Sequence, residues 1–168
     1  HTYESSHSKS YHGMPISFLL GQGKGELSNI GGVRPKINPE HLVIIGARSF
    51  EDEEKAFLEQ NKVRIMYMDE VRSRGFQECF NEAVSIAHGG QRHFGISLDL
   101  DYFNTEVAPG VGSPEPNGGD YESLSNTLKG IMNNEFLAAF EIVEYNPTLD
   151  TDEMTANLVF KLINSIIS

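Results

Sequence analysis

Two aspartates, Asp99 and Asp101, close an apolar stretch of the sequence and are separated by one residue. Residues 94–100 are mostly apolar and lead into a loop rich in proline and glycine, which is typical of a strand buried on both faces. Because side chains alternate along a strand, the two carboxylates would lie on one face, where they repel each other. A metal cation is the commonest way to stabilise such a pair. The alternative is that both carboxylates are solvated at the strand end or cap the next turn.

The segments that would position these aspartates alternate between β-rich apolar runs and helical spacing. We expect strands at residues 41–47, 63–69, 94–101 and 139–145, and helices at 14–20, 51–61, 75–88, 121–133 and 152–168. This alternation predicts an α/β domain with a parallel sheet that helices cover on both faces. Ligand sites of such sheets lie beyond the carboxyl ends of the strands. Asp99, Asp101, Glu144 and the turn at 48–51 all fall there.

The charge of the chain limits its partners. Its 168 residues include 24 Asp and Glu against 13 Lys and Arg, a formal net charge of −11. Nucleic acids and anionic membranes need clustered basic side chains, so both are disfavoured, whereas a cationic substrate or bound metal ions are favoured. Residues 1–168 contain no apolar run long enough to span a bilayer and no recognisable signal peptide, so we expect a cytoplasmic protein.

Other residues with reactive side chains are interpreted as structural. Cys79 is the only cysteine and lies on the apolar face of the predicted helix 75–88, so we expect it in the core. Asp150 and Asp152 form another Asp-x-Asp, but they precede the last predicted helix. Capping of that helix explains them better than metal binding does.

Five motifs together resemble the arginase family of ureohydrolases. They are His12-Gly13-Met14-Pro15, Ile45-Gly46-Ala47-Arg48, Ser97-Leu98-Asp99-Leu100-Asp101, Ala108-Pro109-Gly110-Val111-Gly112-Ser113-Pro114 and Glu144-Tyr145-Asn146-Pro147. The resemblance implies a three-layer αβα fold with a parallel sheet. It also implies a centre of two Mn²⁺ ions that hydrolyses guanidinium groups and releases urea.

Two upstream metal motifs of the family, Gly-Gly-Asp-His and Asp-Ala-His-x-Asp, do not occur in residues 1–168. In the family they supply four of the six metal ligands. We therefore expect the chain to be the C-terminal part of a single arginase-like domain, with four of its eight strands. We also expect residues 1–168 alone to be inactive.

The resemblance assigns roles to individual residues. Asp99 would bridge the two Mn²⁺ ions and Asp101 would bind one of them, so that a metal-bridging hydroxide attacks the guanidinium carbon. Glu144 would pair with the substrate guanidinium, and His12 would pass a proton to the leaving amine. The residues with implied substrate contacts are His1, Ser8, Glu51 and Ser113. For Glu51, a helix N-terminal carboxylate is the alternative interpretation.

The implied reaction is conversion of L-arginine and water to L-ornithine and urea by a homo-oligomer, a trimer or hexamer. Ser8 and the polar loop before His12 favour a substrate with an α-carboxylate, hence arginine. Another ureohydrolase (an agmatinase, a guanidino-acid hydrolase or a formimidoylglutamase) is the alternative within the class. A non-catalytic arginase-like scaffold is the alternative outside it, if the natural protein lacks the upstream motifs.

Overall fold

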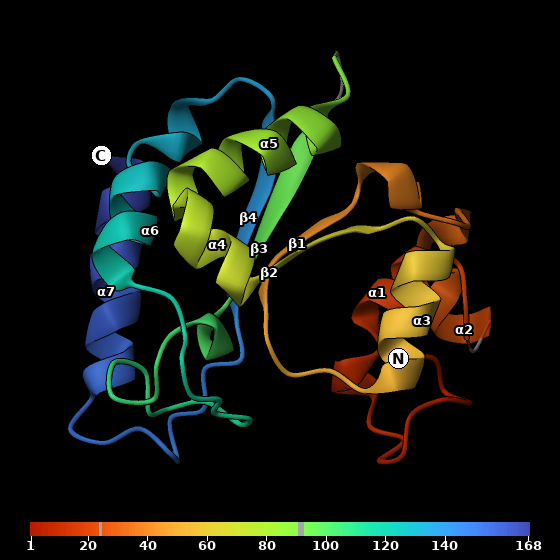
Figure 1. Cartoon of the computed structure of the whole chain (residues 1–168), viewed down its shortest axis with the longest axis horizontal. Helices are drawn as coiled ribbons and strands as arrows, with labels where there is room; N and C mark the ends of the chain where they lie inside the picture. The colour runs from red at the N-terminus through yellow and green to blue at the C-terminus, as the bar shows by residue number, and fades with distance from the viewer. Residues whose placement is uncertain (24, 91–92) are drawn as a thin grey trace. The chain divides into compact units, whose positions relative to one another are not determined.

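The computed structural model describes residues 1–23, 25–90 and 93–168, which divide into two compact units (Figure 1). The first unit comprises residues 1–44 and 49–65, and the second comprises 45–48 and 66–168. Strands β1 (Val43–Ala47) and β2 (Arg64–Tyr67) pair with each other, and each runs from the first unit into the second. Each unit has buried apolar side chains of its own.

The first unit is built from short helices around a small core. Its helical segments are η1 (Tyr11–Gly13), α1 (Pro15–Leu19), α2 (Gly25–Ser28), η2 (Ile30–Gly32), η3 (Pro39–His41) and α3 (Asp52–Gln60). Helix α1 begins with Pro15, whose fixed φ and missing N–H suit the first helical position. Leu20, Leu58 and Val63 are buried together, so the core joins the ends of α1 and α3. The predicted helices 14–20 and 51–61 are confirmed.

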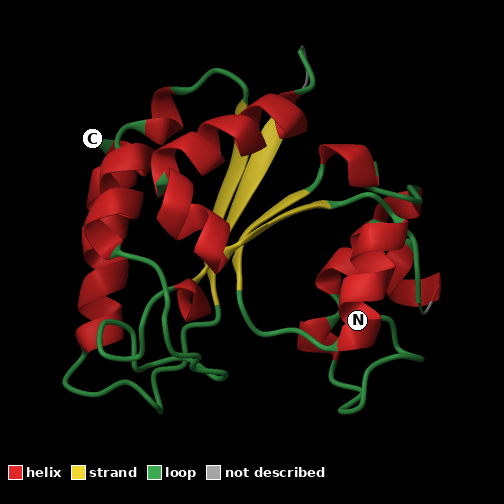
Figure 2. Ribbon diagram, in the orientation of Figure 1, coloured by secondary structure: helices red, strands yellow, loops and turns green. Residues whose placement is uncertain are grey.

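The second unit contains a parallel strand pair with helices beside it (Figure 2). Its further elements are α4 (Met68–Arg74), α5 (Phe76–His88), β3 (Phe94–Asp99), η4 (Leu100–Tyr102), α6 (Tyr121–Leu128), η5 (Ile131–Asn133), β4 (Leu137–Val143) and α7 (Met154–Ile167). Helix α5 packs on β3, and α5, α6 and α7 pack on one another in sequence. Cys79 is fully buried in α5, which confirms its place in the core. Among the described residues, no helix combines the length and apolarity needed to cross a membrane.

The two faces of the β3–β4 pair differ in exposure. Ile96 lies beside Phe140, while on the opposite face Ser97 lies beside Glu141 and both are exposed. The prediction that residues 94–100 are buried on both faces is therefore wrong for the part of the chain that the structure describes. Small and polar residues alternate with apolar ones along β3, and only the apolar ones are buried.

Helix α4 was not predicted. The apolar run at 63–69 continues without interruption from β2 into α4, whose buried residues are Met68 and Val71. Gly75, with φ of +89°, then allows the chain to turn into α5. Arg74 stabilises this junction, because its guanidinium pairs with carboxylates at 2.6–2.9 Å on both helices; they belong to Glu70, Glu78 and Glu82.

Asp150 caps α7, as the sequence predicts. Its Oδ1 accepts a hydrogen bond from the Thr155 N–H at 2.9 Å, and its Oδ2 accepts one from the Ala156 N–H at 3.0 Å. Partial desolvation raises the pKa of Asp150. These two hydrogen bonds are the largest of the interactions that lower it, and the resulting pKa lies below the usual value.

The lowered pKa of Asp150 predicts a pH-dependent contribution to stability. A carboxylate whose pKa is lower in the folded state stabilises the fold above its unfolded pKa of about 4, and this contribution is lost as the pH falls through the folded value. Asp150→Asn should therefore melt at a lower temperature than wild type at pH 7, and the difference should narrow towards pH 3. Thermal melts across this range measure it, and a constant difference would contradict the assignment.

Candidate active site

Three carboxylates gather at the carboxyl end of the β3–β4 pair. Asp99 is the last residue of β3 and lies beside Val143, so Glu144 directly follows the residue paired with Asp99. Asp101 is not in the strand, contrary to the prediction of a strand at 94–101, but in the 3₁₀ turn η4. The Asp99 Oδ1 accepts a hydrogen bond from the Asp101 N–H at 2.8 Å and so caps this turn. The two aspartates are therefore neighbours through a turn rather than along one strand face.

The electrostatics of the cluster favour a bound cation. Desolvation, followed by the negative charges of Asp99 and Glu144, raises the pKa of Asp101 to about 6. Desolvation is also the main cause of the raised pKa of Asp99, and Glu144 contributes in the same direction. The Oδ1 of Asp101 is shielded from solvent and has no hydrogen-bond partner among the described residues. An anionic oxygen in this condition fits a metal ligand, because a cation would offset both the repulsion and the desolvation.

Arg48, directly after β1, fixes the main chain around this cluster. Its Nη2 donates to the carbonyl oxygens of Asp101, of Phe103 at 3.4 Å and of Glu115 at 3.1 Å, and its Nε donates to that of Pro116 at 3.1 Å. A planar guanidinium presents five N–H donors in a fixed geometry, so it can serve several acceptors in different directions at once. Arg48 thus ties the end of β3 to the loop at 103–118.

The loop at 108–116 runs beside Glu144. The backbone N–H of Ser113 bonds to the Asp101 carboxylate, and Val111 forms a β-bridge with Tyr145. A Cβ placed on Gly112 would lie 4.0 Å from Oε2 of Glu144. The structure therefore brings Ser113 to the same cluster as Asp99, Asp101 and Glu144.

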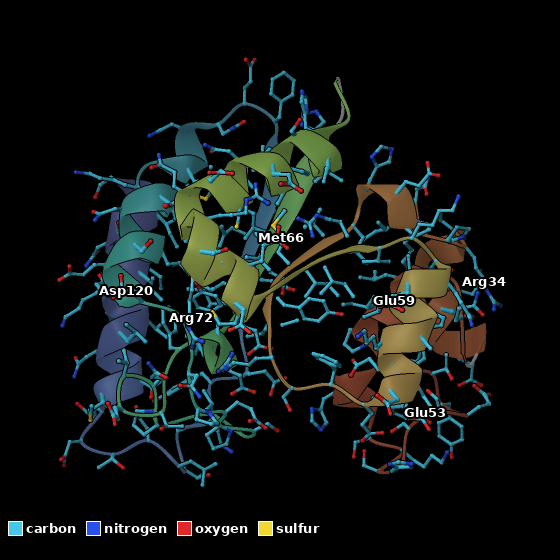
Figure 3. All side chains as sticks on the ribbon, in the orientation of Figure 1. Arg34, Glu53, Glu59, Met66, Arg72 and Asp120 are labelled. Atoms are coloured by element: carbon cyan, nitrogen blue, oxygen red, sulfur yellow. The ribbon has the colours of Figure 1, made fainter. Side chains whose placement is uncertain are left out.

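The far end of this loop is also held in place. Arg72 Nη2 donates to the carbonyl oxygen of Asn117 at 2.5 Å, and the Asp120 carboxylate caps α6 by accepting from the Ser123 N–H at 2.6 Å. Figure 3 labels Arg72, which lies on α4, and Asp120, which precedes α6. The loop that carries Ser113 is thus anchored beyond the cluster as well as within it.

The other predicted site residues belong to the first unit. His12 lies exposed in η1, and Ser8 lies exposed in the preceding loop, where its Oγ accepts from the Ser10 N–H at 3.2 Å. Glu51 is the N-cap residue of α3, where a carboxylate also suits the helix dipole, but its side chain makes no capping hydrogen bond. Its Oε2 lies 3.5 Å from Nε2 of His1 and 3.1 Å from Nδ1 of His7.

His7 and Arg48 are the residues beside the site that sequence reasoning missed. His7 stands in a polar loop without a motif, and Arg48 ends the motif Ile45-Gly46-Ala47-Arg48, which by itself indicates no contact for its side chain. Within residues 1–23, 25–90 and 93–168, no three His, Cys, Asp or Glu side chains are grouped so as to hold a metal. A metal bound by Asp99 and Asp101 would therefore need further ligands.

Comparison with known proteins places these features in a family context. A family model described as the arginase family matches residues 1–168. An arginase of Bacillus caldovelox is 36% identical over 165 residues, which are 98% of this chain and 55% of that protein. Its native structure matches with a TM-score of 0.93 and 35% identity, over 99% of this chain and 56% of that one. The expected resemblance and fold class are confirmed.

Two further solved structures are similar. Entamoeba histolytica arginase in complex with L-ornithine matches with a TM-score of 0.89 and 27% identity, over 100% of this chain and 56% of that one. A formimidoylglutamase of Bacillus subtilis matches with a TM-score of 0.73 and 28% identity, over 79% of this chain and 42% of that one. The chain spans about half the length of the curated arginases it matches.

Proposed function

The chain belongs to the arginase family, and from this premise we propose that the protein carrying it is an amidino hydrolase that converts L-arginine and water to L-ornithine and urea. The observation that carries the proposal is the cluster of Asp99, Asp101 and Glu144 at the carboxyl end of β3 and β4. Such an anionic cluster suits a planar cationic substrate and its metal cofactor.

Asp99 and Asp101 are the proposed ligands of a divalent metal, which we propose to be manganese because hard carboxylate oxygens suit it. The shielded and unpartnered Oδ1 of Asp101 supports this role. When bound, such ions supply Lewis acidity, through which hydroxide becomes available from water near neutral pH. The two aspartates themselves contribute the negative charge that retains the ions.

Glu144 is the proposed partner of the guanidinium group. Its backbone φ of +67° is unusual for a residue with a side chain, and such conformations persist where the surroundings fix them. Val111 pairs with Tyr145, the residue after Glu144, and Gly112 lies close to the Glu144 carboxylate. A fixed anion of this kind can hold the guanidinium through charge-assisted hydrogen bonds while its carbon is attacked.

His12 is the proposed proton donor to the leaving amine. Hydrolysis breaks the bond between the guanidinium carbon and the nitrogen that remains with ornithine, and that nitrogen must gain a proton to leave. Histidine exchanges protons near neutral pH more readily than other side chains do. The exposed position of His12 in η1 leaves the ring open to solvent and substrate.

The α-amino acid end of the substrate is assigned to the first unit. We propose that Ser8 binds the α-carboxylate, that Glu51 binds the α-ammonium group and that His1 contacts the α-amino acid end of the substrate. The Entamoeba histolytica relative is in complex with L-ornithine, an α-amino acid, which supports this assignment. The formimidoylglutamase relative supports a second candidate, a formimino-amino acid substrate. A homo-oligomer and a cytoplasmic location stay predictions.

The decisive experiment measures urea release by the full-length natural protein, loaded with manganese, from L-arginine, agmatine and guanidino acids. Formamide formation from formimidoylglutamate is measured beside it. We expect a strong preference for arginine, because agmatine leaves the polar groups for the carboxylate unpaired. A preference for another substrate would replace the arginase assignment within the family, and no turnover of any of them would favour a non-catalytic scaffold.

Replacing Glu51 by Ala should weaken arginine binding more than it slows the chemistry. The lost ion pair to the α-ammonium lies far from the reacting carbon, so we expect KM to rise by about tenfold and kcat to change by less than about threefold. Steady-state kinetics on the full-length protein measures both constants. Glu59→Ala is the matched control, because Glu59 lies on α3, the helix that Glu51 precedes, and pairs with Lys55; Figure 3 labels Glu59. An equal KM effect in the control would contradict the assignment.

A further inference from the structure

We propose that Thr155, at the start of α7, is a positioning residue that fixes Glu144 through Gly110. The inference rests on the proposed function, since it concerns how the guanidinium partner is held. Thr155 is fully buried although it is polar. Its hydroxyl bonds to the Asp150 carboxylate that caps α7, and it has a further partner beyond this cap. Buried hydroxyls in proteins are hydrogen-bonded, so its partner indicates what the residue is for.

That partner is the backbone of the loop beside Glu144. The Gly110 N–H donates to Oγ1 of Thr155 at 2.7 Å, and this bond is buried. The carbonyl oxygen of the same residue accepts from the Asn146 N–H at 2.8 Å. Gly110 therefore connects α7 on one side to the segment directly after Glu144 on the other.

The contact leaves no room for a bridging molecule. A Cβ added to Gly110 would lie 2.8 Å from the Cβ of Asp150 and 3.0 Å from Oγ1 of Thr155. Distances this short require the neighbouring atoms to move, so only glycine fits between α7 and the loop. The hydrogen bond is thus part of a close packing contact. If it is lost, a water molecule can replace the hydroxyl only when the loop moves away.

Asp150 extends the contact to Tyr145. Its carboxylate accepts from the Thr155 N–H and, at 3.2 Å, from the hydroxyl of Tyr145. Tyr145 also pairs with Val111 in a β-bridge. Both residues that follow Glu144 are therefore held in place. Val111 and Asp150 hold Tyr145, and Gly110 holds Asn146.

This arrangement accounts for the backbone of Glu144. A residue in the left-handed region returns to a more favourable φ unless its surroundings prevent it. Thr155 holds Gly110, Gly110 holds Asn146, and Glu144 is thereby kept in the conformation that sets the direction of its carboxylate. Loss of the Thr155 hydroxyl leaves the Gly110 N–H buried without an acceptor and releases the loop.

The test compares Thr155→Val, Thr155→Ser and wild type in the full-length manganese-loaded protein. A displacement of about 1 Å in a catalytic group can cost about a hundredfold in rate. We expect Thr155→Val to lower kcat for arginine by about 10- to 100-fold with metal content unchanged and KM changed by less than about threefold. Thr155→Ser keeps the hydroxyl and should restore kcat to within about threefold of wild type. If Thr155→Val does not fold, Thr155→Ala takes its place in the same comparison.

Ser165→Ala is the matched control. Ser165 lies on the same helix, and its Oγ donates to the carbonyl oxygen of Ser125 at 3.0 Å, away from Glu144. It should lower the melting temperature and leave kcat unchanged at a temperature where all variants are folded. A wild-type kcat in Thr155→Val, or an equal kcat loss in Ser165→Ala, would overturn the positioning role. A wild-type protein that hydrolyses no guanidine would instead overturn the proposed function, and the positioning role with it.

Discussion

Replacing Asp101 by Asn is expected to abolish arginine hydrolysis in the full-length protein and to lower its manganese content by about half. Asn keeps the size and one oxygen of the side chain but removes the negative charge that makes a carboxylate a strong ligand of a divalent metal. The Oδ1 of Asp101 is shielded from solvent and lacks a hydrogen-bond partner in the described chain, so the carboxylate has no other stabilising contact at that atom. Elemental analysis after dialysis and a urea-release assay measure the two effects.

Asp69→Asn is the matched control for this substitution. Asp69 is also an aspartate of the second unit, but its side chain is 97% exposed and pairs only weakly, at 3.3 Å, with Arg72. It should retain manganese and full activity. Asp99→Asn should reproduce the loss seen for Asp101, because both carboxylates are proposed to hold the same centre. Normal metal content and rate in either variant would mean that the pair is structural and only caps η4.

The positions of the carboxylates could be predicted because sequence patterns mark the ends of strands. An apolar run that stops at Asp99, and another that stops before Asn146-Pro147, place Asp99 and Glu144 at the same edge of a parallel sheet. Asp150 was predictable for a similar reason, since short acidic side chains before a helix are typical caps.

The details that the sequence did not reveal depend on main-chain geometry. Asp101 leaves the strand because the Asp99 carboxylate captures its N–H and starts a turn, and apolar content alone cannot distinguish this from a longer strand. Arg48 binds carbonyl oxygens, which every residue has, so its partners leave no signature in the sequence. Met68 continues an apolar run but begins helix α4. Met68 and Val71 are both buried, and their separation of three residues is the spacing of one helix face.

Replacing Glu144 by Gln should leave the metal content unchanged but greatly reduce turnover of arginine. Gln preserves the shape of the side chain and can still accept a hydrogen bond, yet it cannot form an ion pair with the guanidinium. Removal of one partner of a desolvated charge pair costs on the order of 2–5 kcal/mol, which is roughly 30-fold to several thousand-fold in kcat/KM. Because Glu144 is not proposed as a metal ligand, metal content separates this variant from those of Asp99 and Asp101.

Glu141→Gln, on the strand that ends directly before Glu144, separates the effect of where the negative charge lies from the effect of the charge itself. Glu141 lies on β4, beside Ser97 and exposed, three residues before Glu144, so each variant removes one negative charge from the same stretch of chain. If the general negative field attracted the substrate, both would raise KM to a similar degree, and the effect would weaken with added salt. A specific guanidinium pair instead predicts that Glu144→Gln alone loses rate and that salt does not alter the ratio between the variants. Equal rates for the two variants would mean that the cation is held elsewhere in the protein.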